Sequence, residues 1–138
     1  KIIKLLSDYN LFFIHISMTH LTTKQVAARY YELTSDSLLD KIYDELYHED
    51  CVSIEPDDKL LPKRVMWIGA IKEKWEYFNS LIEEAYSAYC DKPIFAGNTF
   101  ACAMGMDATL KGYWRVEINE IAVFSVKDGK IVSEEYFW

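Results

Sequence analysis

The sequence predicts an α+β fold in which helices pack against one face of a curved antiparallel sheet. Three observations lead to this fold class. Apolar residues recur at helical spacing in the first two thirds of the chain, and they alternate in strand fashion in the last third. Asp128-Gly129 joins two alternating segments and is typical of a two-residue β-hairpin. Helices that precede a run of antiparallel strands favour an α+β layout.

Three helices are expected before residue 91. The first lies over 19–34, where Thr residues can cap it and apolar residues follow at helical spacing. A second, shorter helix lies over 35–50. The third and clearest lies over 68–90, where one apolar stripe continues for about six turns before Pro93.

Strands are expected over 51–56, 100–107, 113–126 and 130–138. In the Asp128-Gly129 hairpin, a regular register places Val126 opposite Ile131, Phe124 opposite Ser133 and Glu120 opposite Phe137.

The other face of this hairpin is apolar as well. Its residues are Ile121, Val123, Val132, Tyr136 and Trp138. Only one face of a sheet can meet the helices, so the other needs a cover, and a second subunit is the natural candidate. A homodimer through the outer sheet face is therefore expected.

Composition and charge exclude several function classes. The net charge is −7 and no cluster of Lys or Arg occurs, so neither nucleic acid nor an anionic membrane surface is an expected partner. No apolar run approaches the roughly 20 residues of a membrane span. The three cysteines form no C-x-x-C pair and the three histidines are scattered, so neither a disulfide framework nor a metal site is expected. These features favour a reducing, cytoplasmic location.

The first 17 residues are expected to be an extension outside the domain. Their apolar residues recur at helical spacing, so an amphipathic helix is one interpretation. A signal peptide is a second, weakened because no small-residue cleavage motif follows, and a misplaced start is a third. Residues 18–138 are expected to form one complete domain.

Glu120 is the one carboxylate on an otherwise apolar strand face. The residues that share this face are Trp114, Val116, Ile118, Ala122, Phe124 and Val126. Ionising a carboxyl there costs desolvation energy, so the pKa of Glu120 is expected to lie above its ordinary value. The alternative is that Glu120 pairs with Arg115, with a lysine or with a tyrosine hydroxyl.

The order of elements and the C-terminal string "EIAVFSVKDGKIVSEEYFW" resemble the nuclear transport factor 2-like fold, and more narrowly its SnoaL-like and ketosteroid-isomerase-like group. The resemblance covers residues 20–138. It implies a cone-shaped, curved antiparallel sheet with helices on its concave face, an apolar pocket inside, and often a dimer through the outer sheet face. It does not fix a function, because this fold hosts isomerases, cyclases and pure binding modules.

Three residues match positions that carry the chemistry of ketosteroid isomerases. In "ARYYEL", Tyr30 matches a hydroxyl that donates to the developing oxyanion; in "IEP", Glu55 matches the proton-shuttling base. In "NEIAVF", Glu120 matches a protonated acid that is the second oxyanion donor. Both acids are Glu where the isomerases have Asp, which moves each carboxyl about one methylene further from its strand.

Each of these residues also has a plain structural interpretation. Tyr30 can serve helix packing, and Glu55 can be a solvated acid at a strand end. Glu134 and Glu135 are expected to be solvated, and Cys102 to be a small buried hydrophobe. The residues expected to line a ligand pocket are Trp75, Phe78, Phe100, Met104, Trp114 and Ile118.

Two function classes follow from these residues. The first is a cofactor-free isomerase or cyclase that acts on a small apolar carbonyl compound; the second is a non-catalytic ligand-binding or protein-interaction domain. Dehydratase and epoxide hydrolase chemistries fit less well. The dehydratases of this fold need a catalytic histidine on the pocket strands, but no histidine lies beyond His48. The epoxide hydrolases need an arginine beside their acids, but Arg115 is at an odd offset from Glu120, which places the two on opposite strand faces. Neither a cofactor nor a metal is expected.

Overall fold

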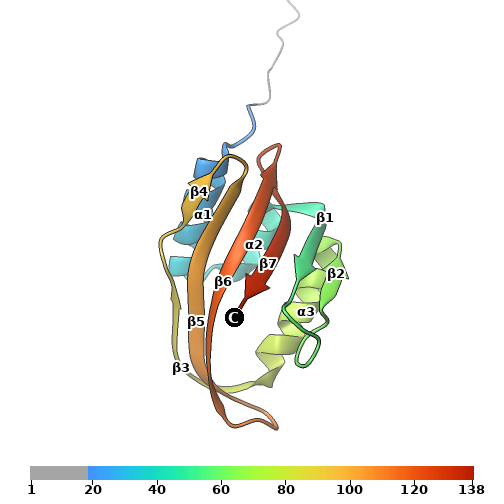
Figure 1. The fold of residues 1–138 in the computed structure, drawn as a ribbon, viewed down its shortest axis with the longest axis vertical. Helices are drawn as coiled ribbons and strands as arrows, with labels where there is room; N and C mark the ends of the chain where they lie inside the picture. Colours follow the sequence, from blue (N-terminus) through green and yellow to red (C-terminus); the bar gives the residue numbers. More distant parts are fainter. Residues whose placement is uncertain (1–18) are drawn as a thin grey trace, which may run out of the picture.

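The computed structural model describes residues 19–138, so the expected extension over 1–17 lies outside the described residues. The described part contains three helices and seven strands (Figure 1). No helix in this part of the chain is long and apolar enough to cross a membrane.

Helix α1 (Thr23–Ser35) begins at the cap that the sequence predicts. The Thr22 hydroxyl accepts a hydrogen bond from the Gln25 amide at 3.3 Å, and the Gln25 side chain accepts one from the Thr22 amide at 2.8 Å. This reciprocal pair satisfies amide groups that the first turn of a helix leaves without partners. The buried side chains of α1 are Val26, Ala27, Tyr30 and Leu33.

The two following helices are shorter than expected. Helix α2 (Leu39–Leu46) gives way to strand β1 (Tyr47–Ile54), and helix α3 (Ile68–Leu81) gives way to strand β3 (Ile82–Cys90). The expected helices over 35–50 and 68–90 are therefore wrong in their second parts. Both segments pair with strands that are distant in sequence, and these ladder hydrogen bonds outweigh a local helical period.

One sheet contains all seven strands, in the order β2-β1-β7-β6-β5-β3, with the short strand β4 (Ile94–Ala96) also paired to β5 (Thr99–Leu110). Strand β2 (Arg64–Met66) forms the edge beside β1. The sheet is mixed, because β1 and β7 (Lys130–Phe137) run parallel, so the expectation of an entirely antiparallel sheet is wrong at this one pair. The sheet is curled without closing, and the helices lie on its concave side, which confirms the predicted α+β cone (Figure 1).

The β6–β7 hairpin confirms the predicted turn but not the predicted register. Strand β6 (Arg115–Lys127) ends at Asp128 and Gly129, whose φ angles of 49° and 75° are those of a type I′ turn. Val126 pairs with Ile131 as expected, but Ser125 pairs with Ser133. Val132 is thus the extra residue of a β-bulge.

The bulge moves the rest of β7 to the opposite faces. Phe124 pairs with Glu134 rather than Ser133, and Phe137 lies opposite Ile121 rather than Glu120. Because side chains alternate along a strand, Glu134 and Tyr136 point into the concave side instead of out of it. The expected outer-face positions of Tyr136 and Trp138 are therefore wrong, and Phe137 takes their place beside Ile121 and Val123.

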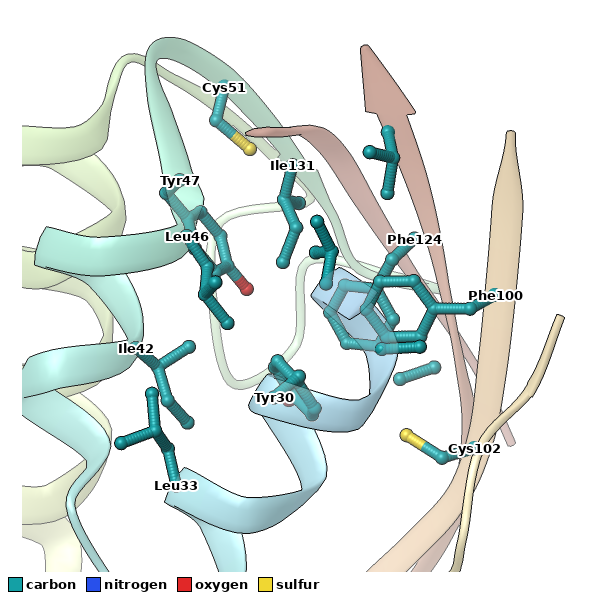
Figure 2. Packing of buried hydrophobic residues seen from close by; sticks show 14 of the residues in the cluster. Tyr30, Leu33, Ile42, Leu46, Tyr47, Cys51, Phe100, Cys102, Phe124 and Ile131 are labelled. Atoms are coloured by element: carbon teal, nitrogen blue, oxygen red, sulfur yellow. The ribbon is translucent and has the colours of Figure 1, made fainter. Parts of the chain in front are cut away.

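The core fills one end of the cone, between α1, α2 and the middle of the sheet (Figure 2). Phe100 and Phe124 stack with their ring centroids 4.6 Å apart, and the Tyr30 ring lies 4.7 Å from Phe124. Leu33 and Leu46 complete the cluster from the helices, and both are almost fully buried. Each such side chain contributes roughly 1.5–3 kcal/mol by leaving water.

The hairpin turn provides a test of the packing around the start of α1. Gly129 and Gly97 both have positive φ, so alanine at either position costs about 1 kcal/mol of backbone strain. A Cβ at Gly97 meets open space, whereas one at Gly129 would lie 2.8 Å from the Leu21 nitrogen. We therefore expect Gly129→Ala to reduce the free energy of unfolding in urea clearly more than Gly97→Ala. Equal losses would contradict this contact.

Candidate functional site

A cavity of about 1170 Å³ lies between the concave face of the sheet and the helices. Its volume exceeds the range of roughly 300–1,000 Å³ that is usual for small-molecule pockets. Aromatic side chains form part of its wall, among them Tyr30, Tyr43, Tyr47, Trp75, Phe78 and Tyr136. The cavity thus offers a largely apolar surface to a bound molecule, and carboxylate and lysine side chains also line it, among them Asp40, Asp57 and Lys72.

The three residues expected to carry chemistry all line this cavity. Tyr30 comes from α1, Glu55 directly follows β1, and Glu120 comes from the middle of β6. The structure thus brings together side chains that lie as far apart in the sequence as residues 30 and 120.

Tyr30 lies on the border between the core and the cavity. Its ring packs against Phe100 and Phe124, and only 7% of the residue is exposed. Its hydroxyl has no hydrogen-bond partner among the described residues. Every fully buried side-chain oxygen or nitrogen in this part of the chain has such a partner, so the Tyr30 hydroxyl is not fully buried and reaches open space. Burial raises the pKa of Tyr30 well above its usual value, so the hydroxyl stays protonated and can donate.

Glu55 is buried rather than solvated. The residue is 8% exposed, and its Oε1 accepts a hydrogen bond from Lys74 Nζ at 2.6 Å. The interpretation of Glu55 as a solvated strand-end acid is therefore wrong. Its Oε2 makes no hydrogen bond within the described part of the chain, so one oxygen of this carboxylate is held and the other is open.

Lys74 is a functional candidate that the sequence reading missed. It lies on α3 with 1% of its side chain exposed. Its ammonium group is 4.7 Å from the centre of the Trp75 ring and 5.3 Å from that of Tyr136. The sequence did indicate that Lys74 is buried. It lies three residues after Ile71 and four before Phe78, which places it on the apolar face of the helix.

Glu134 is the second missed residue. It is fully buried on β7, where Ser53 Oγ donates to its Oε1 at 2.5 Å and the Tyr47 hydroxyl donates to its Oε2. The expectation that Glu134 is solvated is wrong, because the bulge at Val132 turns it inward. Burial and the negative charge of Glu134 raise the pKa of Tyr47 well above its usual value, so Tyr47 remains a donor.

Glu120 lines the cavity, and its pKa is raised. Burial, and next the negative charge of Glu55, raise its pKa from the ordinary value of 4.5 to about 7. It has no hydrogen bond or ion pair with another described residue. The alternative pairing with Arg115 is wrong, since Arg115 binds the two Asp107 oxygens at 2.8 and 2.6 Å on the outer face.

The residues expected to line the pocket fall into two groups. Trp75, Phe78, Met104 and Ile118 line the cavity. Phe100 belongs to the core instead, and Trp114 is 88% exposed in the turn before β6, where the strand alternation does not yet apply. Within residues 19–138, no three His, Cys, Asp or Glu side chains lie close enough to hold a metal ion.

The sequence model of the SnoaL-like domain family matches residues 21–138. The chain belongs to the SnoaL-like domain family. Among curated proteins, none matches this chain.

Solved structures share the fold of this SnoaL-like domain. One is a Mesorhizobium loti protein named for the SnoaL-like polyketide cyclases, with a TM-score of 0.80 and 22% identity over 86% of this chain and 100% of that one. A nuclear transport factor 2-like protein of unknown function from Burkholderia pseudomallei has a TM-score of 0.68 and 16% identity over 84% and 89%. A Bacillus subtilis protein named as an isomerase has a TM-score of 0.66 and 17% sequence identity, over 86% of this chain and 89% of that one. At these identities the likeness shows the fold alone.

The shifted titration of Glu120 predicts how folding depends on pH. Since its pKa is raised to about 7, the folded state keeps a proton that the unfolded chain loses near 4.5. Glu120 therefore weakens folding as pH rises from about 4.5 to 7, and a penalty of up to about 3 kcal/mol remains above that.

Glu120→Gln keeps the shape and a donor but removes this titration. We expect the variant to be at least as stable as the parent at pH 8, with the advantage fading towards pH 4.5, in thermal melts across this range. Glu117→Gln, exposed on the same strand, is the matched control and should follow the parent at every pH. A clear loss of stability at pH 8 in Glu120→Gln would mean that the acid is ionised and paired.

Proposed function

We propose that this SnoaL-like domain is a cofactor-free enzyme that moves a proton on the carbon next to the carbonyl group of a small apolar molecule. This chemistry serves both isomerisation and aldol-type cyclisation. The observation that carries the proposal is the meeting of the Tyr30 hydroxyl, the open Glu55 oxygen and the Glu120 carboxyl, with its raised pKa, on one aromatic cavity.

The roles follow from the protonation states. Glu55 Oε2 takes the proton from the α-carbon, and the electron pair of the broken C–H bond moves to the carbonyl oxygen to give an enolate. Tyr30 and protonated Glu120 donate hydrogen bonds to that oxygen, where negative charge develops. In an isomerisation, Glu55 then returns the proton to the same carbon or to a conjugated one. In a cyclisation, the enolate carbon attacks a second carbonyl, whose C=O π electrons move to its oxygen, and this alkoxide takes up the proton from Glu55, so that no cofactor is consumed.

A specific observation favours a second function, a ligand-binding domain without catalysis. Glu55 is held by Lys74 at 2.6 Å, and a buried carboxylate in such an ion pair can serve structure alone. In that case the cavity binds the same apolar class of molecule, and the acids only orient it.

Proton exchange separates the two functions. 2-Tetralone is a rigid apolar ketone that fits a cavity of this size, and proton abstraction next to its carbonyl replaces hydrogen by deuterium in D2O, which NMR follows. We expect the parent to accelerate this exchange, Glu55→Gln to reduce it to the background rate, and Tyr30→Phe to slow it roughly 100-fold, the usual effect of removing one oxyanion donor.

Tyr31→Phe is the matched control, because Tyr31 neighbours Tyr30 but does not line the cavity, and its exchange rate should equal that of the parent. Binding of 2-tetralone by the parent without faster exchange would overturn the enzyme and support the binding domain.

We further propose a homodimer through the outer sheet face and a cytoplasmic location. Ile121 and Phe137 are paired on this face and are 52% and 49% exposed, with Val123 beside them. The free thiols Cys51, Cys90 and Cys102 are compatible with a reducing compartment.

The dimer has a direct test. Sedimentation at micromolar concentration should show a dimer for the parent and a monomer for Ile121→Lys, because a lysine pair would be buried in the interface. Lys127→Met, at the exposed end of the same strand, serves as the control and should remain dimeric. A monomeric parent would contradict the proposal.

A further inference from the structure

The buried network behind the cavity wall has a defined direction. The Lys74 ammonium can only donate, and it donates to Ser53 Oγ at 2.5 Å and to Glu55 Oε1 at 2.6 Å. Ser53 has a single hydrogen and gives it to Glu134, which also accepts from the Tyr47 hydroxyl. The Ser53 and Tyr47 hydroxyls both donate to Glu134, and two of the three ammonium hydrogens bind Ser53 and Glu55, so the position of each group fixes the next.

Lys74 is placed to orient other groups rather than to react. Its side chain is 1% exposed, and it is absent from the cavity wall. It lies 3.8 Å from Glu134 Oε1, so one ammonium faces two buried carboxylates, Glu55 just after β1 and Glu134 on β7. Because it binds only Oε1 of Glu55, the second oxygen stays available on the cavity side.

We propose that Lys74 is a positioning residue that holds the Glu55 carboxylate at the cavity wall and shares its charge with Glu134, leaving Glu120 without an ion-pair partner. The proposal rests on the proposed function, because it assigns Lys74 the task of orienting the base of that reaction. It assigns Glu134, Ser53 and Tyr47 the task of holding Lys74.

The charge balance gives the reason for this arrangement. Three carboxyl groups and one ammonium share a poorly solvated region, and among the described residues Lys74 is the only cation that forms an ion pair with any of them. Glu55 accepts a hydrogen bond from the ammonium, and Glu134 lies 3.8 Å from it while accepting hydrogen bonds from Ser53 and Tyr47. The third carboxyl, Glu120, is exposed to the field of its neighbours and keeps its proton to higher pH.

The charged groups that act on Glu120 lie just after β1, on α3 and on β7. Glu55 and Glu134 raise its pKa and Lys74 lowers it, while Tyr136 and Cys102 have raised pKa values themselves and stay neutral near pH 7. Removing the charge of Lys74 should therefore change the pKa of Glu120, whereas a residue that only filled space would leave that pKa unchanged.

The test follows the Glu120 carboxyl by 13C NMR across pH, with Glu120→Gln to identify its signal. In the parent the midpoint should lie near 7. Lys74→Met keeps the apolar stem without the charge, and the midpoint should rise by about one pH unit. Lys74→Arg should restore it. Lys41→Met, on an exposed lysine of α2 outside the cavity, is the matched control and should leave it unchanged.

Exchange of 2-tetralone provides the second arm. Lys74→Met should lose at least about 100-fold in exchange rate while its Kd for 2-tetralone changes little, because the base is misplaced but the cavity remains. Lys74→Arg should recover most of the rate. If the parent shows no exchange, the proposed function fails, and the Glu120 midpoint still decides the role of Lys74.

Folding of the variants is checked by near-ultraviolet circular dichroism, and Lys74→Gln, whose amide can still donate, replaces Lys74→Met if that variant unfolds. If Lys74→Met and Lys74→Gln both unfold while Lys74→Arg folds, the buried carboxylates need a cation at this position, as proposed. An unchanged Glu120 midpoint in a folded, uncharged variant would overturn the proposal, as would unfolding of Lys74→Arg together with the others.

Discussion

The β-bulge at Val132 is the constraint on which the interior of this SnoaL-like domain depends. A regular hairpin would direct Ser133 and Glu135 into the cone and leave Glu134 and Tyr136 outside. The extra residue reverses these faces for the second half of β7. One backbone irregularity thereby places a carboxylate behind the cavity and an aromatic ring in its wall. Bulges near functional sites commonly re-aim side chains in this way.

The inward carboxylate in turn makes a buried lysine possible. An ammonium group without partners would be too costly inside a protein, but Lys74 has Ser53 and Glu55 within hydrogen-bond distance and Glu134 just beyond. The aromatic rings of Trp75 and Tyr136 cover it on the remaining sides. Hydrogen bonds therefore join Lys74, Ser53, Glu55, Glu134 and Tyr47 into one connected network, not a set of separate pairs.

The core and the cavity share a boundary, and Tyr30 lies on it. Its ring belongs to the cluster of Phe100 and Phe124, which fixes the ring in place, while its hydroxyl reaches the cavity. A donor held by core packing loses little freedom when it binds an oxygen, which is the form of preorganisation that oxyanion stabilisation needs. Stability and the proposed chemistry thus draw on the same side chains.

The sequence by itself determined the α+β class, the Asp128-Gly129 turn, and the helical and strand faces that bring Tyr30 and Glu120 to the concave side. These depend on local period and turn chemistry, which a sequence states directly. It also indicated the raised pKa of Glu120, because a lone carboxyl on an apolar strand face is visible as a pattern. Only the tertiary structure decided the ends of α2 and α3, the parallel β1–β7 pair, the bulge, and with it the inward turn of Glu134 and the partner of Lys74. The physical reason is that strand pairing and register are settled between segments far apart in the sequence, such as Ser53 and Glu134, which are 81 residues apart. There, hydrogen bonds and burial across the sheet override what any local stretch prefers.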